Sequence, residues 1–145
     1  PVSLFSPMVL PDFNCSPQCP RAMRRSAGLP VDSPAHPRLC GTFPRVSGKY
    51  SRDIKLFPLD EAVYKITCNR AEVFCLKRRC TIDIDNFADL VIFNPDTVID
   101  KASYTSPKLH ADGIESVFIN GELVWENDES KENRPGMFLS GKKFN

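Results

Sequence analysis

The clearest amphipathic segment lies in the middle of the chain, in PLDEAVYKIT, residues 58–67. Its apolar residues recur at the i, i+3, i+4, i+7 spacing of one helix face. They are Leu59, Ala62, Val63 and Ile66. Asp60 and Glu61 stand near the expected N-terminus, where the helix dipole favours acidic side chains. The pattern predicts a helix here, and RAEVFCL, residues 70–76, predicts a second short helical turn.

The pattern changes to that of strands after Cys80. ADLVIFN, residues 88–94, is a nearly continuous apolar run that stops at a proline, which predicts a strand covered on both faces. In ESVFINGELVWE, two runs of strand-forming residues flank Asn120 and Gly121. Both central residues of a type I′ turn need positive φ, which Asn-Gly tolerates best, so a hairpin is expected. The polar tail beyond Asn127 is expected to be surface loop.

Prolines are concentrated at the start of the chain, since nine of the 13 lie in the first 44 residues. They disfavour long helices and central strands, so this part is predicted to be loop. Residues 43–53 can form a short helix with Pro44 in its first turn. About three strands and one secure helix make a thin core for 145 residues, which predicts that the chain packs against something outside itself.

Composition fits one small globular domain or a piece of a larger one, with 41% hydrophobic and 26% charged residues. A formal net charge of +1 gives no field that would attract nucleic acid or anionic lipid. The apolar run near the N-terminus is broken by Ser6, Pro7, Pro11 and Asp12, and it has no positive leader. The expectation is a soluble, cytoplasmic protein without nucleic-acid or membrane partners.

Six cysteines would suit a secreted disulfide scaffold, but without a secretory signal reduced thiols are expected. Two pairs, Cys15/Cys19 and Cys75/Cys80, fit zinc-ligand spacings only loosely, and no histidine follows either at a useful distance. We therefore expect no metal site within this chain.

Four stretches, in order, resemble the C-terminal third of the D-aminoacylase (N-acyl-D-amino-acid deacylase) branch of the zinc amidohydrolases. They are GLPVDSPAHPRLCGTFPRVSGKYSRD, PLDEAVYKITCNRAEVFCLKRR, FADLVIFNPDTVIDKASY and GIESVFINGELVWEN. The likeness runs from about Ser26 to about Lys143. Its most specific parts are HPR..GTFPRV and ADLVIFNPDTV.D.A.Y, because both are long and collinear with the family.

The resemblance implies an α/β architecture, a (β/α)₈ barrel with a small β-domain built from both chain ends. Residues 1–25 are an unmatched, proline-rich segment; 26–79 would end the barrel, with the active-site loop and last helices; 80–145 would give C-terminal strands of the small β-domain. Members of the family hydrolyse the amide of N-acyl-D-amino acids with zinc. Barrel enzymes carry their chemistry on loops after the strands.

By the same resemblance, the HPR stretch is a loop after the eighth barrel strand that reaches over the active site. Arg38 would then hold a substrate carboxylate with its two-donor guanidinium, and His36 would shape or line the loop. The alternatives are a solvated or carbonyl-capping role for Arg38 and a purely structural turn role for His36.

The chain also departs from the family pattern. Ala27 stands where the family triplet SDG has the aspartate that handles the proton of the metal-bound water, and a methyl group cannot accept a proton. Arg24 and Arg25 precede it, where a barrel strand would be apolar. Three family glycines are replaced here by Cys75, Cys80 and Asp85. If those positions have positive φ, each replacement costs about 1 to 2 kcal/mol, and less for aspartate.

Three functional hypotheses follow. The first is a fragment or degenerate relative of an N-acyl-D-amino-acid deacylase, inactive alone because the family's metal ligands lie on earlier strands and Ala27 replaces the aspartate. The second is a non-catalytic assembly module that pairs its strands with the missing N-terminal part or with another chain. A third, a hydrolase with its own nucleophile, is disfavoured, because Ser26, Ser33 and the cysteines form no arguable triad with only two histidines in the chain.

Overall fold

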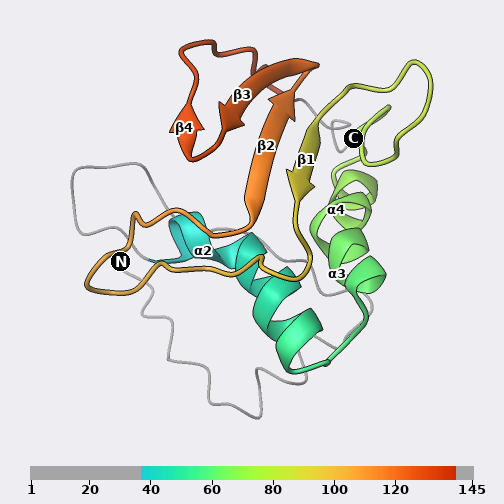
Figure 1. Cartoon of the computed structure of the whole chain (residues 1–145). Helices are drawn as coiled ribbons and strands as arrows, with labels where there is room; N and C mark the ends of the chain where they lie inside the picture. The colour runs from blue at the N-terminus through green and yellow to red at the C-terminus, as the bar shows by residue number, and fades with distance from the viewer. Residues whose placement is uncertain (1–36, 140–145) are drawn as a thin grey trace, which may run out of the picture.

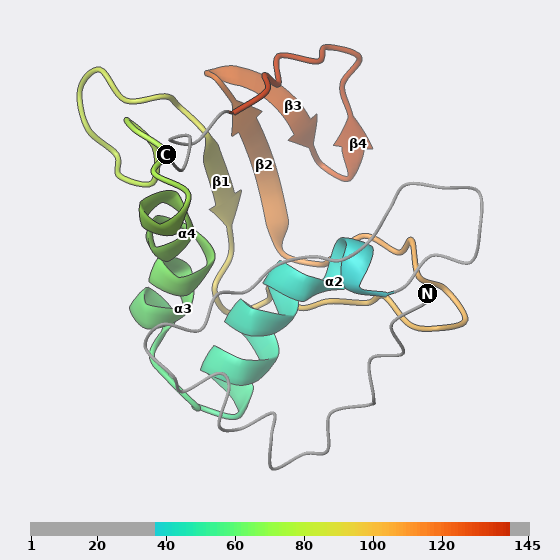
Figure 2. The same ribbon diagram turned by 180° about the vertical axis from the view of Figure 1, so that it is seen from behind.

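A computed structural model describes residues 37–139 of the chain. It contains helices α2 (Arg38–Arg45), η1 (Val46–Asp53, π-helical), α3 (Leu59–Ile66) and α4 (Cys68–Val73). These are followed by strands β1 (Leu90–Phe93), β2 (Ile114–Ile119), β3 (Glu122–Glu126) and β4 (Glu129–Ser130). Figures 1 and 2 show the helices gathered at one end and flank of the sheet. Ala27 and His36 lie outside the described residues.

The central helix forms as predicted. Helix α3 covers Leu59–Ile66, and Ala62, in the middle of its apolar face, is completely buried. Ala62 packs with Val46 and Phe57 in a core that lies between η1 and α3 rather than against the sheet. Lys65 is buried as well, because its ammonium group pairs with Glu61 one turn earlier and lies 4.9 Å from the centre of the Phe57 ring. Helix α4 begins two residues before the predicted second turn.

The prediction of loop up to residue 44 is wrong from Arg38 onward, since α2 begins there. Pro44 consequently lies inside α2 and not in the first turn of a helix over 43–53. An interior proline removes one hydrogen bond of the helix. The helix continues because a distant segment holds it: the Arg45 side chain is fixed by Asp100, 55 residues further along the chain.

The four strands form one antiparallel sheet in the order β1-β2-β3-β4. The predicted hairpin is confirmed: Asn120 and Gly121 connect β2 to β3 with φ values of 50° and 86°. The tail was expected to be loop, but β4 forms after a second tight turn at Asn127 and Asp128, both also at positive φ. These two turns are why a short meander closes without longer loops.

The expectation that residues 88–94 form a strand covered on both faces is wrong in the described part of the chain. The strand itself is present as β1, but Val91 and Ile92 remain 54% and 48% exposed. Within the described residues β1 pairs with β2 alone and forms one edge of the sheet. The apolar run therefore has no full cover among residues 37–139.

None of the helices within residues 37–139 has the length and apolar character needed to cross a bilayer.

Candidate functional site

The two most specific motifs of the sequence lie against each other in the structure. HPR..GTFPRV supplies α2 and the start of η1, and ADLVIFNPDTV.D.A.Y supplies β1 and the segment after it. Residues 95–102 run along the α2–η1 helix (Figure 1). We call this helix and segment the motif junction.

An ion pair closes one end of the motif junction. Arg45 donates from Nε and Nη2 to Oδ2 of Asp100, at 2.8 and 2.5 Å. The Asp100 side chain is 4% exposed, while that of Arg45 is 43% exposed. The hydrogen bond to Asp100 raises the pKa of Arg45, against an opposing effect of burial. Gly41 lets α2 lie close to the segment that carries Asp100, since a methyl group on Gly41 would lie 3.2 Å from the Asp100 side chain.

A second arginine closes the other end. Arg52 donates from Nη1 to the carbonyl oxygens of Val98 and Asp96, at 2.9 and 3.0 Å, and more weakly to that of Pro95. Between the two arginines, Gly48 faces the carbonyl of Val98, and a methyl group on Gly48 would lie 2.1 Å from that oxygen. The two motifs that carry the family resemblance are thus joined by close backbone packing.

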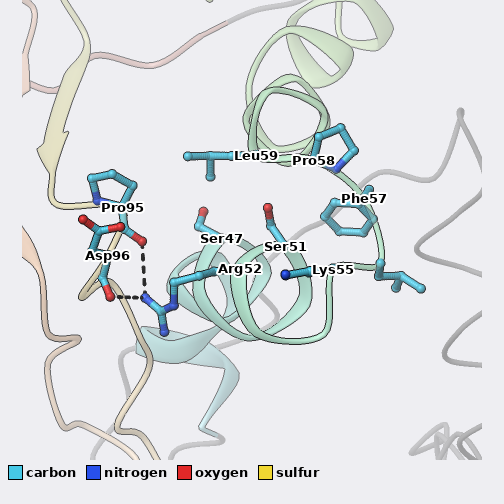
Figure 3. Close-up of a pocket in the computed structure, with 10 residues that line it drawn as sticks. Ser47, Ser51, Arg52, Lys55, Phe57, Pro58, Leu59, Pro95 and Asp96 are labelled. Carbon is cyan, nitrogen blue, oxygen red and sulfur yellow. Dashed lines mark hydrogen bonds between the residues drawn. The ribbon is translucent and has the colours of Figure 1, made fainter.

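A cavity of about 670 Å³ opens beside the motif junction (Figure 3). Its walls come from η1, the linker to α3 and the turn at Pro95 and Asp96. The hydroxyl groups of Ser47 and Ser51 lie on one wall, and Arg52 crosses to the turn. No histidine or cysteine lines this cavity, and Arg52 is occupied with carbonyl groups. The contacts of Arg52 at this cavity hold η1 against the turn at Pro95 and Asp96.

The sequence-predicted site residues are only partly placed. Arg38 is the first residue of α2, so its backbone lies in the helix rather than in a loop, while His36 and Ala27 fall outside residues 37–139. The substrate role of Arg38 stays a prediction.

Within the part of the chain that the structure describes, no three His, Cys, Asp or Glu side chains gather as a metal site would require. The candidate zinc pair Cys75/Cys80 therefore gains no further ligands there, and Cys15 and Cys19 lie outside this part. Cys75 and Cys80 by themselves supply only two of the four ligands that a tetrahedral zinc site needs.

The residues that sequence reasoning missed are those of the motif junction, Arg45, Arg52 and Asp100. Arg45 and Asp100 both belong to the quoted motifs, and their opposite charges were the available signal. The Arg45–Asp100 contact gives a structural reason for the presence of both motifs in one chain.

The contribution of the Arg45–Asp100 ion pair to stability is testable. We expect Asp100→Asn to lower the free energy of unfolding by about 1 to 2 kcal/mol, because a buried carboxylate that accepts two charged hydrogen bonds is replaced by a neutral amide. Urea denaturation measures it. Asp112→Asn is the matched control, since Asp112 pairs with Lys101 at the surface with both side chains about half exposed. It should change stability by less than about 0.5 kcal/mol, and equal losses in the two variants would contradict a special role for Asp100.

Comparison with known proteins identifies the wider relationship. No protein-family model matches the chain. D-aminoacylase of Alcaligenes xylosoxydans xylosoxydans is 47% identical over 115 residues, which cover 79% of this chain and 24% of that protein. N-acyl-D-glutamate deacylase of the same organism is 43% identical over 114 residues, covering 79% of this chain and 23% of that protein.

Solved structures similar to this chain come from the same kinds of protein as the sequence relatives. A D-aminoacylase mutant in complex with copper chloride has a TM-score of 0.88 and 45% identity, with 92% of this chain and 28% of that one covered. N-acyl-D-glutamate deacylase from Bordetella bronchiseptica, complexed with zinc and a phosphonate mimic of the tetrahedral intermediate, has a TM-score of 0.85 and 38% identity, with 92% and 28% covered.

These relatives place the chain in the amidohydrolase class. Within that class it is homologous to the C-terminal portion of the D-aminoacylases and N-acyl-D-amino-acid deacylases, which confirms the resemblance read from the sequence. The chain spans about a quarter of the length of the curated relatives it matches.

Proposed function

We propose that this chain provides the C-terminal portion of an N-acyl-D-amino-acid deacylase, a hydrolase of amide bonds, and that it is inactive without the remainder of the barrel. The observation that carries the proposal is the motif junction, in which both family motifs pack as one unit in a chain 47% identical to a D-aminoacylase. Residues 26–79 would end the barrel, and residues 80–145 would supply strands of the small β-domain.

Within such an enzyme, Arg38 would hold the carboxylate of an N-acyl-D-amino acid. Its position at the start of α2 supports this role, because the preceding residues can form the loop over the site while the helix anchors them. His36 would shape that loop. A zinc ion, which supplies a polarised water in this class, would be held by residues of the remaining barrel. Ala27 would leave the proton of that water without its acceptor.

The isolated 145-residue chain should show no hydrolysis of N-acyl-D-amino acids above the uncatalysed rate, with or without added zinc. Amine release from a panel of acylated D-amino acids measures this. Turnover that is abolished by a chelator would contradict the proposal.

A chimera tests the positive side. Residues 26–145 would replace the homologous C-terminal portion of the Alcaligenes D-aminoacylase, to which they are 47% identical over the matched region. The chimera should fold but have negligible kcat, and Ala27→Asp in the same chimera should raise kcat at least about 100-fold, because a proton acceptor is restored. Ala111→Asp is the matched control, because it adds the same carboxylate to a loop segment outside the predicted site, and it should leave kcat unchanged. A folded Ala27→Asp chimera without activity would contradict the assignment of this position.

A second candidate function is that of a non-catalytic assembly module. It is favoured by the edge strand β1, whose Val91 and Ile92 are about half exposed. Such an edge can pair with a strand of another chain. Sedimentation equilibrium distinguishes the two candidates: a concentration-dependent dimer or larger assembly is expected of a module, and a monomer across the micromolar range would contradict it.

A further inference from the structure

Cys68 and Cys80, which are 12 residues apart in the sequence, come together at the start of α4. Cys68, the first residue of α4, donates a hydrogen bond from its Sγ to the carbonyl oxygen of Cys80 at 3.2 Å. Cys80 is exposed and Cys68 half-buried, so small molecules can reach the pair. Both are free thiols in the structure.

The loop that carries Cys80 is held in place by its own contacts. Arg78 donates from Nε to the carbonyl oxygen of Asp85 at 2.6 Å, and its own carbonyl accepts the Phe87 amide at 2.9 Å. The guanidinium of Arg79 lies 4.2 Å from the centre of the Phe87 ring. Cys80 itself has a φ of 86°. These contacts hold the segment around Cys80 beside Cys68 in the described structure.

The geometry points to Cys68 and Cys80 as a reversible disulfide site, oxidised by a small-molecule disulfide of the glutathione type. One protein thiolate attacks a sulfur of the oxidant and releases the first small thiol. The second protein thiolate then displaces the bound half, which forms the Sγ–Sγ bond and releases the second small thiol. The protein thiols lose two protons and two electrons, and the electrons reduce the oxidant to its two thiols. This inference is independent of the proposed deacylase function.

The surroundings of the pair set its reactivity. The hydrogen bond with Cys68 raises the pKa of the Cys80 thiol to about 11, with smaller contributions from burial and from the nearby Glu72 carboxylate. The Glu72 carboxylate is itself held by Tyr64, whose hydroxyl donates a hydrogen bond to it at 3.1 Å. Because the thiolate is the reacting form, oxidation should be slow near pH 7 and at least about tenfold faster near pH 9.

Peptide mapping tests the inference on the intact chain. The reduced, folded chain is incubated with oxidised glutathione, free thiols are blocked with N-ethylmaleimide, and the product is digested with trypsin. Cys68, Cys75 and Cys80 fall on separate tryptic peptides, residues 66–70, 71–77 and 80–101. The expected product joins 66–70 to 80–101, with a mass about 2 Da below the sum of the two.

Variants and a denatured sample complete the test. Cys75→Ser is the matched control and should keep the linked product, whereas Cys68→Ser should abolish it and leave Cys80 as a glutathione adduct. A parallel reaction in 8 M urea (about twice a typical unfolding midpoint) should distribute links among several cysteines. A link of Cys80 to Cys75 in the folded chain, glutathione adducts alone, or the same distribution as in urea would each overturn the inference.

Discussion

Gly48→Ala is expected to destabilise this chain by about 3 kcal/mol or more, although alanine is the better helix former. Gly48 lies in η1 and is buried. A methyl group there would lie 2.1 Å from the carbonyl oxygen of Val98, a backbone atom that cannot rotate away. The same Val98 is confined on its other side by Gly113, where a methyl group would lie 2.6 Å from the Val98 amide nitrogen. Neither segment can shift without loosening the motif junction.

The measurement is the midpoint of thermal unfolding by circular dichroism, which should fall by about 15 °C for a domain of this size. Gly136→Ala is the matched control, because nothing lies within 4 Å of the methyl group it would add. That variant should melt within about 2 °C of the parent chain. A stabilised Gly48→Ala variant would mean that the α2–η1 helix does not pack against residues 95–102 as described.

Features decided by local chemistry could be predicted from the sequence. The Asn120-Gly121 hairpin needs only two residues that accept positive φ, and the structure has both there. Helix α3 follows from four apolar residues and two acidic ones within a single segment. The turn at Asn127 and Asp128 obeys the same rule as the first hairpin and could have been found by it, since both residue types tolerate positive φ.

Features decided by distant contacts could not be predicted. Pro44 marks a helix start in a local reading, yet α2 begins six residues earlier. Its contacts with Asp100 are distant in sequence, since Arg45 pairs with Asp100 across 55 residues and Gly41 packs against the same side chain. The exposure of β1 is similar: an apolar run predicts burial, but whether a face is covered depends on which chain packs on it. For the candidate site, the resemblance named Arg38, and only the structure revealed the contacts of Arg45 and Arg52.

The positive φ that the sequence prediction required at the replaced family glycines is present in the structure. The three residues that replace family glycines, Cys75, Cys80 and Asp85, have φ values of 52°, 86° and 67°. At positive φ, a residue other than glycine lowers the stability of the fold by about 1 to 2 kcal/mol, and aspartate lowers it by less. The loop between α4 and β1 therefore carries strain at three positions, in addition to Arg78 at 61°.

Restoring glycine at these positions should stabilise the chain. Cys75→Gly and Cys80→Gly should each raise the free energy of unfolding by about 1 kcal/mol, since relief of strain exceeds the greater entropy of glycine in the unfolded state. Asp85→Gly should give about half of that, and the triple variant about 2 kcal/mol. Urea denaturation should show a higher midpoint with an unchanged slope, which marks a change in stability alone.

Lys77→Gly separates relief of strain from mere loosening of the loop. Lys77 lies in the same loop and is exposed, but it is not among the described residues with positive φ. Glycine there relieves nothing and adds entropy to the unfolded chain, so it should lower stability by about 0.5 kcal/mol. Opposite signs for Lys77→Gly and Cys80→Gly are the decisive result, because the two changes differ chiefly in the backbone angle of the residue replaced. If both variants lost stability, the loop would have to hold Cys80 in another conformation.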